Sequence, residues 1–161
     1  MRRTVGIAAG IAAAATIALV APSCGDSTAP GPRQYIANLS PANEVPLKTT
    51  TGTGVVTFVD NGTTIDWTMT LTNMLNVTGS HIHLPAPVGV NAAVAIFLFT
   101  PITPTGTLNG LVSKGSITNS SNVGVSLDSL RVLFNNGNAY VNVHTAANPG
   151  GEIRDQVHPV P

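Results

Sequence analysis

The clearest hydrophobic pattern in the chain is a strict alternation between positions 64 and 72. Apolar residues occupy every second position there (Ile65, Trp67, Met69 and Leu71), with threonine or aspartate between them. Because successive side chains of a strand point to opposite faces, this pattern predicts a strand with one buried and one solvated face. The preceding Asp60-Asn61-Gly62 predicts a hairpin turn from another strand at 53–59, since Asn-Gly accepts positive φ.

Short runs of β-branched and apolar residues between turn residues predict further strands at 35–39, 79–84, 93–99, 106–112, 139–145 and 152–157. One segment has helical spacing instead: Leu127, Leu130, Leu133 and Phe134 follow a good N-cap, Ser126, and precede Asn136-Gly137. We expect a short helix there that covers one end of the sheets. The whole pattern predicts an all-β fold, an antiparallel β-sandwich of the immunoglobulin-like or superoxide-dismutase-like kind, with one short helix.

The first 23 residues have the order of an export signal. Arg2 and Arg3 precede an apolar stretch at 5–20, and small residues follow it up to Cys24. We expect cleavage before Cys24, which resembles the lipidated cysteine of a bacterial lipoprotein. An ordinary signal peptide and a retained membrane anchor are the alternatives, although the apolar run is short for a bilayer span. Residues 24–33, rich in Pro, Gly and small polar residues, predict a flexible tether.

Removal of this segment changes the charge and leaves one folding unit. Loss of Arg2 and Arg3 leaves five basic residues against seven acidic ones, so the composition excludes the basic surface that nucleic-acid binding requires. Beyond Cys24 there is no further cysteine, and therefore no disulfide. We expect one domain at 34–158, stabilised by its core, in the cell envelope on the extracytoplasmic side of a membrane.

Most of the candidate chemistry lies in two motifs. In Ser80-His81-Ile82-His83, both histidines share one strand face while Ile82 points to the core. In Tyr140-Val141-Asn142-Val143-His144-Thr145, the valines point inward, so that Tyr140, Asn142 and His144 point outward. If the two strands are neighbours in one sheet, the three imidazoles converge.

These motifs resemble the CHRD domain, a module named after chordin and also found in exported bacterial proteins. The matching segments are 39–46 (LSPANEVP), 81–83 (HIH) and 140–154, which ends in Asn148-Pro149-Gly150-Gly151-Glu152-Ile153-Arg154. The likeness covers 34–157 and departs from the family at Leu84 and Asp155, where glycine is usual. It implies an exported β-sandwich without an established enzymatic role. The structural or ligand-binding motif would comprise Tyr140, Asn142, His144, Glu152 and Arg154.

Two functional interpretations follow. In the first, the domain is a membrane-tethered binding or structural module that contacts an envelope or extracellular protein or a glycan, with no catalytic residue and no cofactor. Each histidine then hydrogen-bonds backbone in the loops, and Glu152 and Arg154 pair with each other or with loop groups.

In the second interpretation, His81, His83 and His144 bind copper or zinc, for which neutral imidazoles are good ligands. Copper/zinc superoxide dismutases use a similar His-x-His pair on a β-barrel, which makes redox activity conceivable. A histidine-rich zinc loop and a cysteine pair are missing from this sequence, which argues against dismutation. Convergence of the three ring nitrogens would favour a metal, and rings that face apart would favour a scaffold.

Overall fold

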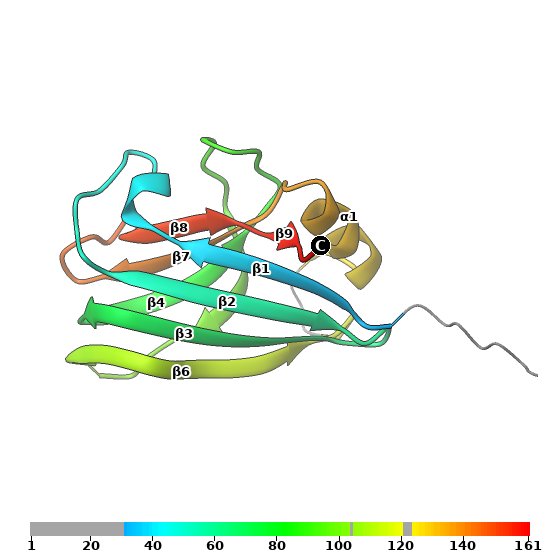
Figure 1. Ribbon diagram of the computed structural model, residues 1–161, viewed down its shortest axis with the longest axis horizontal. Coiled ribbons are helices and arrows are strands. Elements are labelled where there is room, and N and C mark those ends of the chain that lie inside the picture. Colours follow the sequence, from blue (N-terminus) through cyan, green and yellow to red (C-terminus); the bar gives the residue numbers. More distant parts are fainter. Residues whose placement is uncertain (1–30, 104, 121–123) are drawn as a thin grey trace, which may run out of the picture.

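The computed structural model describes residues 31–103, 105–120 and 124–161, which form a two-layer β-sandwich (Figure 1). The first sheet has the strand order β6-β3-β2-β1-β9 and the second β5-β4-β7-β8, with antiparallel pairing throughout. The strands are β1 (Arg33–Leu39), β2 (Thr53–Asp60), β3 (Ile65–Leu75), β4 (Val77–His83), β5 (Val94–Phe99), β6 (Thr107–Ile117), β7 (Tyr140–Thr145), β8 (Ile153–Gln156) and β9 (His158–Pro159). The all-β sandwich expected from the sequence is confirmed.

The alternating segment is the centre of the larger sheet. Strand β3 buries Ile65, Trp67, Met69 and Leu71 against the second sheet, while Thr68, Thr70 and Thr72 are exposed. It pairs with β2 through the predicted hairpin, in which Gly62 has φ +88°. The opposite sheet contributes Ile82, Val141, Val143 and Ile153 to the same core.

Several element bounds differ from those expected. Strand β6 continues to Ile117 and β3 to Leu75, because each extends along the other through two register shifts. Strand β9 pairs with β1 for two residues, and a 3-10 helix (Pro41–Asn43) follows Leu39. These additions depend on tertiary pairing, for which a short segment carries no local signal.

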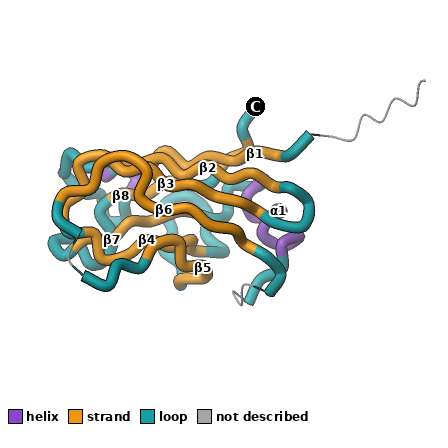
Figure 2. Tube along the Cα trace, turned by 90° about the horizontal axis from the view of Figure 1, so that it is seen from below, coloured by secondary structure: helices purple, strands orange, loops and turns teal. Residues whose placement is uncertain are grey.

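The helix α1 (Leu127–Asn135) lies at one end of the sandwich, as Figures 1 and 2 show. Its Ser126 N-cap and its buried Leu127, Leu130 and Phe134 agree with the sequence prediction. Phe134 packs against Tyr35 and Phe58, with ring centroids 5.2 and 5.0 Å away. The helix therefore closes the core at that end.

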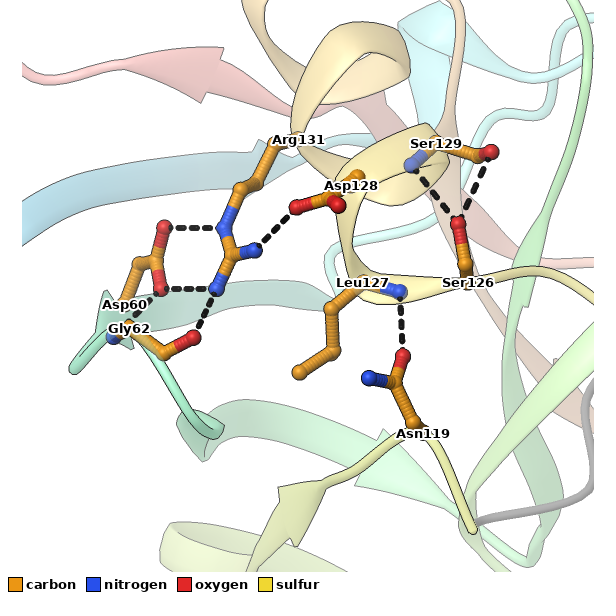
Figure 3. A network of polar contacts seen from close by, with 8 residues as sticks. All are labelled: Asp60, Gly62, Asn119, Ser126, Leu127, Asp128, Ser129 and Arg131. Atoms are coloured by element: carbon orange, nitrogen blue, oxygen red, sulfur yellow. Dashed lines mark hydrogen bonds and ion pairs between the residues drawn. The ribbon is translucent and has the colours of Figure 1, made fainter.

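An arginine on the helix connects it to the β2–β3 turn (Figure 3). The Arg131 guanidinium donates to both carboxylate oxygens of Asp60, at 2.7 and 2.8 Å, and to the Gly62 carbonyl at 2.6 Å. It also donates to Asp128 one turn earlier, at 2.7 Å. Hydrogen bonding to Arg131 lowers the pKa of Asp60, which keeps this carboxylate ionised.

At the edge formed by β1 and β8 the two sheets are joined. Ser40 and Arg154 exchange two backbone hydrogen bonds of 3.1 Å, from each amide to the other residue's carbonyl. This bridge brings the loop that follows β1 to the outer face of β8, where Glu44 becomes buried. The outer face of the smaller sheet is therefore covered in part, and it carries the polar residues described next.

Within the ranges that the structure describes, no helix is long and apolar enough to cross a membrane. The expected signal segment, Cys24 and most of the tether lie outside those ranges.

Candidate metal centre

Strands β4 and β7 bring three histidines together on the outer face of the smaller sheet. His81 and His83 lie on β4, and His144 lies on the neighbouring β7, directly opposite Gly79. Gly79 makes room for the cluster, because a Cβ there would lie only 3.3 Å from the Cε1 and Nε2 atoms of His81. The predicted convergence of the three rings is therefore present.

The three rings form one compact group. One ring nitrogen from each histidine lies within 4.8 Å of those of the other two. The ring centroids are separated by 4.9 Å between His81 and His144, 5.8 Å between His81 and His83, and 6.0 Å between His83 and His144. Three nitrogens around one ion at about 2.0 Å would lie roughly 3.5 Å apart, so the rings would move closer together to coordinate one ion.

Backbone carbonyls orient two of the rings. His83 Nδ1 lies 2.9 Å from the Ala92 carbonyl oxygen, and His144 Nδ1 lies 2.9 Å from that of Pro149. Since a carbonyl can only accept, Nδ1 carries the proton in both rings and leaves a lone pair on Nε2. Metal-binding histidines usually have this arrangement, in which the nitrogen that does not bind the metal donates to a carbonyl.

One nitrogen of each ring is buried and unsatisfied. His81 Nδ1, His83 Nε2 and His144 Nε2 have no hydrogen-bond partner in the structure. Such groups are rare in folded proteins, since each unpaired buried polar atom costs about 1–3 kcal/mol. Three such nitrogens belong to this one cluster, and each neutral imidazole carries one lone pair that a ligand can accept.

Burial keeps the imidazoles neutral, as metal binding requires. It lowers the pKa of His81 to about 4, with smaller contributions from His144 and His83. Burial also lowers the pKa of His83 and of His144, and the hydrogen bonds to Ala92 and Pro149 oppose that effect only in part. At neutral pH the three imidazoles are therefore uncharged, and each has a lone pair on one ring nitrogen.

Tyr140 and Arg154 hold the loop that carries Ala92. The Tyr140 hydroxyl accepts from the Ala92 amide at 3.2 Å, while Arg154 donates to the Val90 carbonyl at 2.7 Å and to Asn91 Oδ1 at 2.8 Å. Tyr140 thus anchors this loop through its hydroxyl. Arg154 contacts the loop as well, and its pairing with Glu152, one of the expected options, is not formed.

Glu152 makes hydrogen bonds within the turn between β7 and β8. Its carboxylate accepts from Thr145 Oγ1 at 2.5 Å and from Asn148 Nδ2 at 3.1 Å. These bonds stabilise the turn that presents the Pro149 carbonyl to His144. Gly151 in the same turn has φ +127°, as expected for a glycine-dependent conformation.

Asn142 has a partner that sequence reasoning missed. Its Nδ2 donates to Glu44 Oε1 at 2.7 Å, and both side chains are buried. Burial raises the pKa of Glu44 to about 7, although the Val45 amide and Arg154 lower it. The signal available in the sequence was a lone glutamate in segment 39–46, which cannot reveal a contact with a residue 98 positions away.

The fold and the site together define an all-β sandwich with a partly buried three-histidine cluster on one sheet. A family model described as the CHRD domain matches residues 35–157, and the chain belongs to this family. CHRD is a non-catalytic domain family, which favours a binding or structural role. No curated protein and no solved structure matches the chain.

Proposed function

We propose that this CHRD domain binds one transition-metal ion, copper or zinc, through His81, His83 and His144. The observation that carries the proposal is the convergence of the three rings, each of which has a buried nitrogen without a hydrogen-bond partner. A purely structural role explains the bonds to Ala92 and Pro149 but leaves the opposite nitrogens unsatisfied. A bound ion satisfies all three at once.

The test is metal titration of the unmodified domain purified without a histidine tag. We expect one equivalent to bind, and we expect replacement of any one cluster histidine by asparagine to weaken binding at least about 100-fold, since a ligand is lost. His158→Asn is the matched control, because His158 is exposed and outside the cluster. Absence of binding at micromolar metal, or equal losses in the control, would refute the proposal.

We also propose that the domain works in the cell envelope, tethered by a lipid on Cys24. The supporting features are the order of Arg2 and Arg3, an apolar run, small residues and Cys24, followed by the Pro- and Gly-rich tether. Its partners would then be the membrane, through the lipid, and a protein or glycan outside the cytoplasm.

Membrane attachment can be tested with the full chain produced in a bacterial host. The unmodified chain should sediment with membranes and carry acyl mass on an N-terminal Cys24. Cys24→Ser should abolish the acyl mass, whereas Ser23→Ala should retain it. Equal membrane retention of Cys24→Ser with the leader still attached would indicate the retained anchor.

A further inference from the structure

The donor set of the proposed centre is neutral. Within the described ranges, the group of convergent metal-ligating side chains comprises only His81, His83 and His144, with no carboxylate or thiolate. An ion bound there keeps its full charge in a partly buried site. Since the cost of moving an ion out of water rises steeply with its charge, a singly charged ion is favoured relative to a doubly charged one.

The positive charge of Arg154 lies close to the cluster, next to the tyrosine ring that stacks on His83. The Tyr140 ring stacks on His83 with centroids 4.7 Å apart and an interplanar angle of 1°. The Arg154 guanidinium carbon lies 3.5 Å from the centroid of the same phenol ring. This charge disfavours further positive charge at the site.

Little negative charge is available to compensate. Glu44 interacts with Arg154, but burial raises its pKa to about 7, so it is substantially protonated near neutral pH. Glu152 is engaged by Thr145 and Asn148.

The number of protein ligands also favours a singly charged ion, namely cuprous copper. Structural zinc sites have four protein ligands, and three-ligand zinc sites complete their shell with water or substrate. Cuprous copper is stable with three nitrogen donors. We infer that the proposed centre is selective for copper in its cuprous state, which it binds more tightly than cupric copper or zinc. This inference rests on the proposed metal-binding function.

The first test compares the three ions on the unmodified, tag-free domain at pH 7. Cuprous copper is titrated without oxygen in competition with bicinchoninate, and cupric copper and zinc are titrated against chelators of known affinity. We expect the cuprous Kd to lie at least about 100-fold below the zinc Kd. Tighter binding of zinc or cupric copper would overturn the selectivity and leave metal binding intact, whereas absence of all binding would overturn both.

The second test adds a negative charge beside the cluster. Phe97 pairs with His81 across β4 and β5, its ring centroid is 4.8 Å from that of His81, and it is 67% exposed. Phe97→Glu should therefore fold, with Phe97→Gln as its neutral control. Relative to that control, Phe97→Glu should tighten zinc binding about tenfold and change cuprous binding by less than about threefold. Equal tightening of both ions would contradict the charge argument.

Discussion

The phenol ring of Tyr140 lies parallel to the imidazole of His83, with 4.7 Å between their centroids. The same tyrosine hydroxyl accepts from the Ala92 amide, and the Ala92 carbonyl accepts from His83 Nδ1. Tyr140 thus contacts one ring of the histidine cluster directly and also holds the carbonyl that orients it. Replacing a second-shell contact of a metal-binding histidine typically lowers metal affinity by about 10–100-fold.

Tyr140→Phe separates the two contributions of this residue. The stacking on His83 remains, but the bond to Ala92 is lost, so the loop carbonyl is less firmly placed. We expect metal affinity to fall about tenfold and the free energy of unfolding by about 1 kcal/mol. Competition titration and urea denaturation measure the two effects. Tyr35→Phe is the control, since the Tyr35 hydroxyl is buried in the main core without a partner; a similar loss of affinity there would contradict the positioning role.

The sequence was sufficient to place the histidines on one surface because the period of two in a strand determines side-chain direction. His81 and His83 flank the core residue Ile82, and His144 follows the core residue Val143, so both strands had known outer faces. That β4 and β7 are neighbours could not be derived from periodicity, because pairing between strands some 60 residues apart depends on the whole fold. The convergence was therefore a conditional prediction that the structure confirms.

The contacts made by the 85–93 loop could not be predicted from the sequence for a related reason. Nothing in the composition of 85–93 shows that Ala92 rather than another residue presents its carbonyl to His83. Arg154 was expected to pair either with Glu152 or with loop groups, and it binds the loop at Val90 and Asn91. The contacts at Ala92 and Val90 end on backbone carbonyls, which are the same in every residue and so leave no trace in the side-chain pattern.

Gly151 occupies a position that excludes any side chain for two reasons, its backbone conformation and the lack of space around its Cα atom. Its φ of +127° is strained for other residues, and a Cβ would collide with Asn142 Nδ2 and lie 2.6 Å from Glu44 Oε1. Gly151→Ala should therefore lower the free energy of unfolding by about 2–4 kcal/mol, read from the midpoint of urea denaturation. Gly150→Ala is the neighbouring control, because its Cβ would meet nothing within 4 Å. Equal costs at the two glycines would rule out this account.

Glu44 should make stability depend on pH in an unusual direction for a carboxylate. Its pKa is about 7 in the folded chain and near 4.5 in the unfolded one, so folding takes up a proton. The contribution is most favourable below pH 4.5 and is lost as the pH rises through 7, by up to about 3 kcal/mol.

Glu44→Gln tests this dependence, since glutamine keeps the acceptor for Asn142 but does not titrate. The variant should be more stable than the unmodified domain at pH 8.5, and the difference should decline steadily toward pH 5. Chemical denaturation of both metal-free proteins at several pH values provides the comparison. Subtracting one from the other cancels the histidines, whose lowered pKa values act in the opposite direction. If the difference in the free energy of unfolding between the two proteins stays constant from pH 5 to 8.5, the raised pKa of Glu44 is wrong.

The ion pair between Arg131 and Asp60 should contribute more than the one between Arg131 and Asp128. The Asp60 side chain is 6% exposed and accepts two bonds from the guanidinium, whereas the Asp128 side chain is 92% exposed. Arg131→Met leaves a buried carboxylate without its cation and detaches the helix from the β2–β3 turn, so we expect a loss of about 2–3 kcal/mol in the free energy of unfolding. Asp128→Ala should cost less than about 0.5 kcal/mol, because exposed pairs contribute little. Thermal and urea unfolding at pH 7 measure both. Comparable losses would mean that Asp60 is hydrated well enough to tolerate the missing arginine, and the helix would then be held mainly by Leu130 and Phe134 in the core.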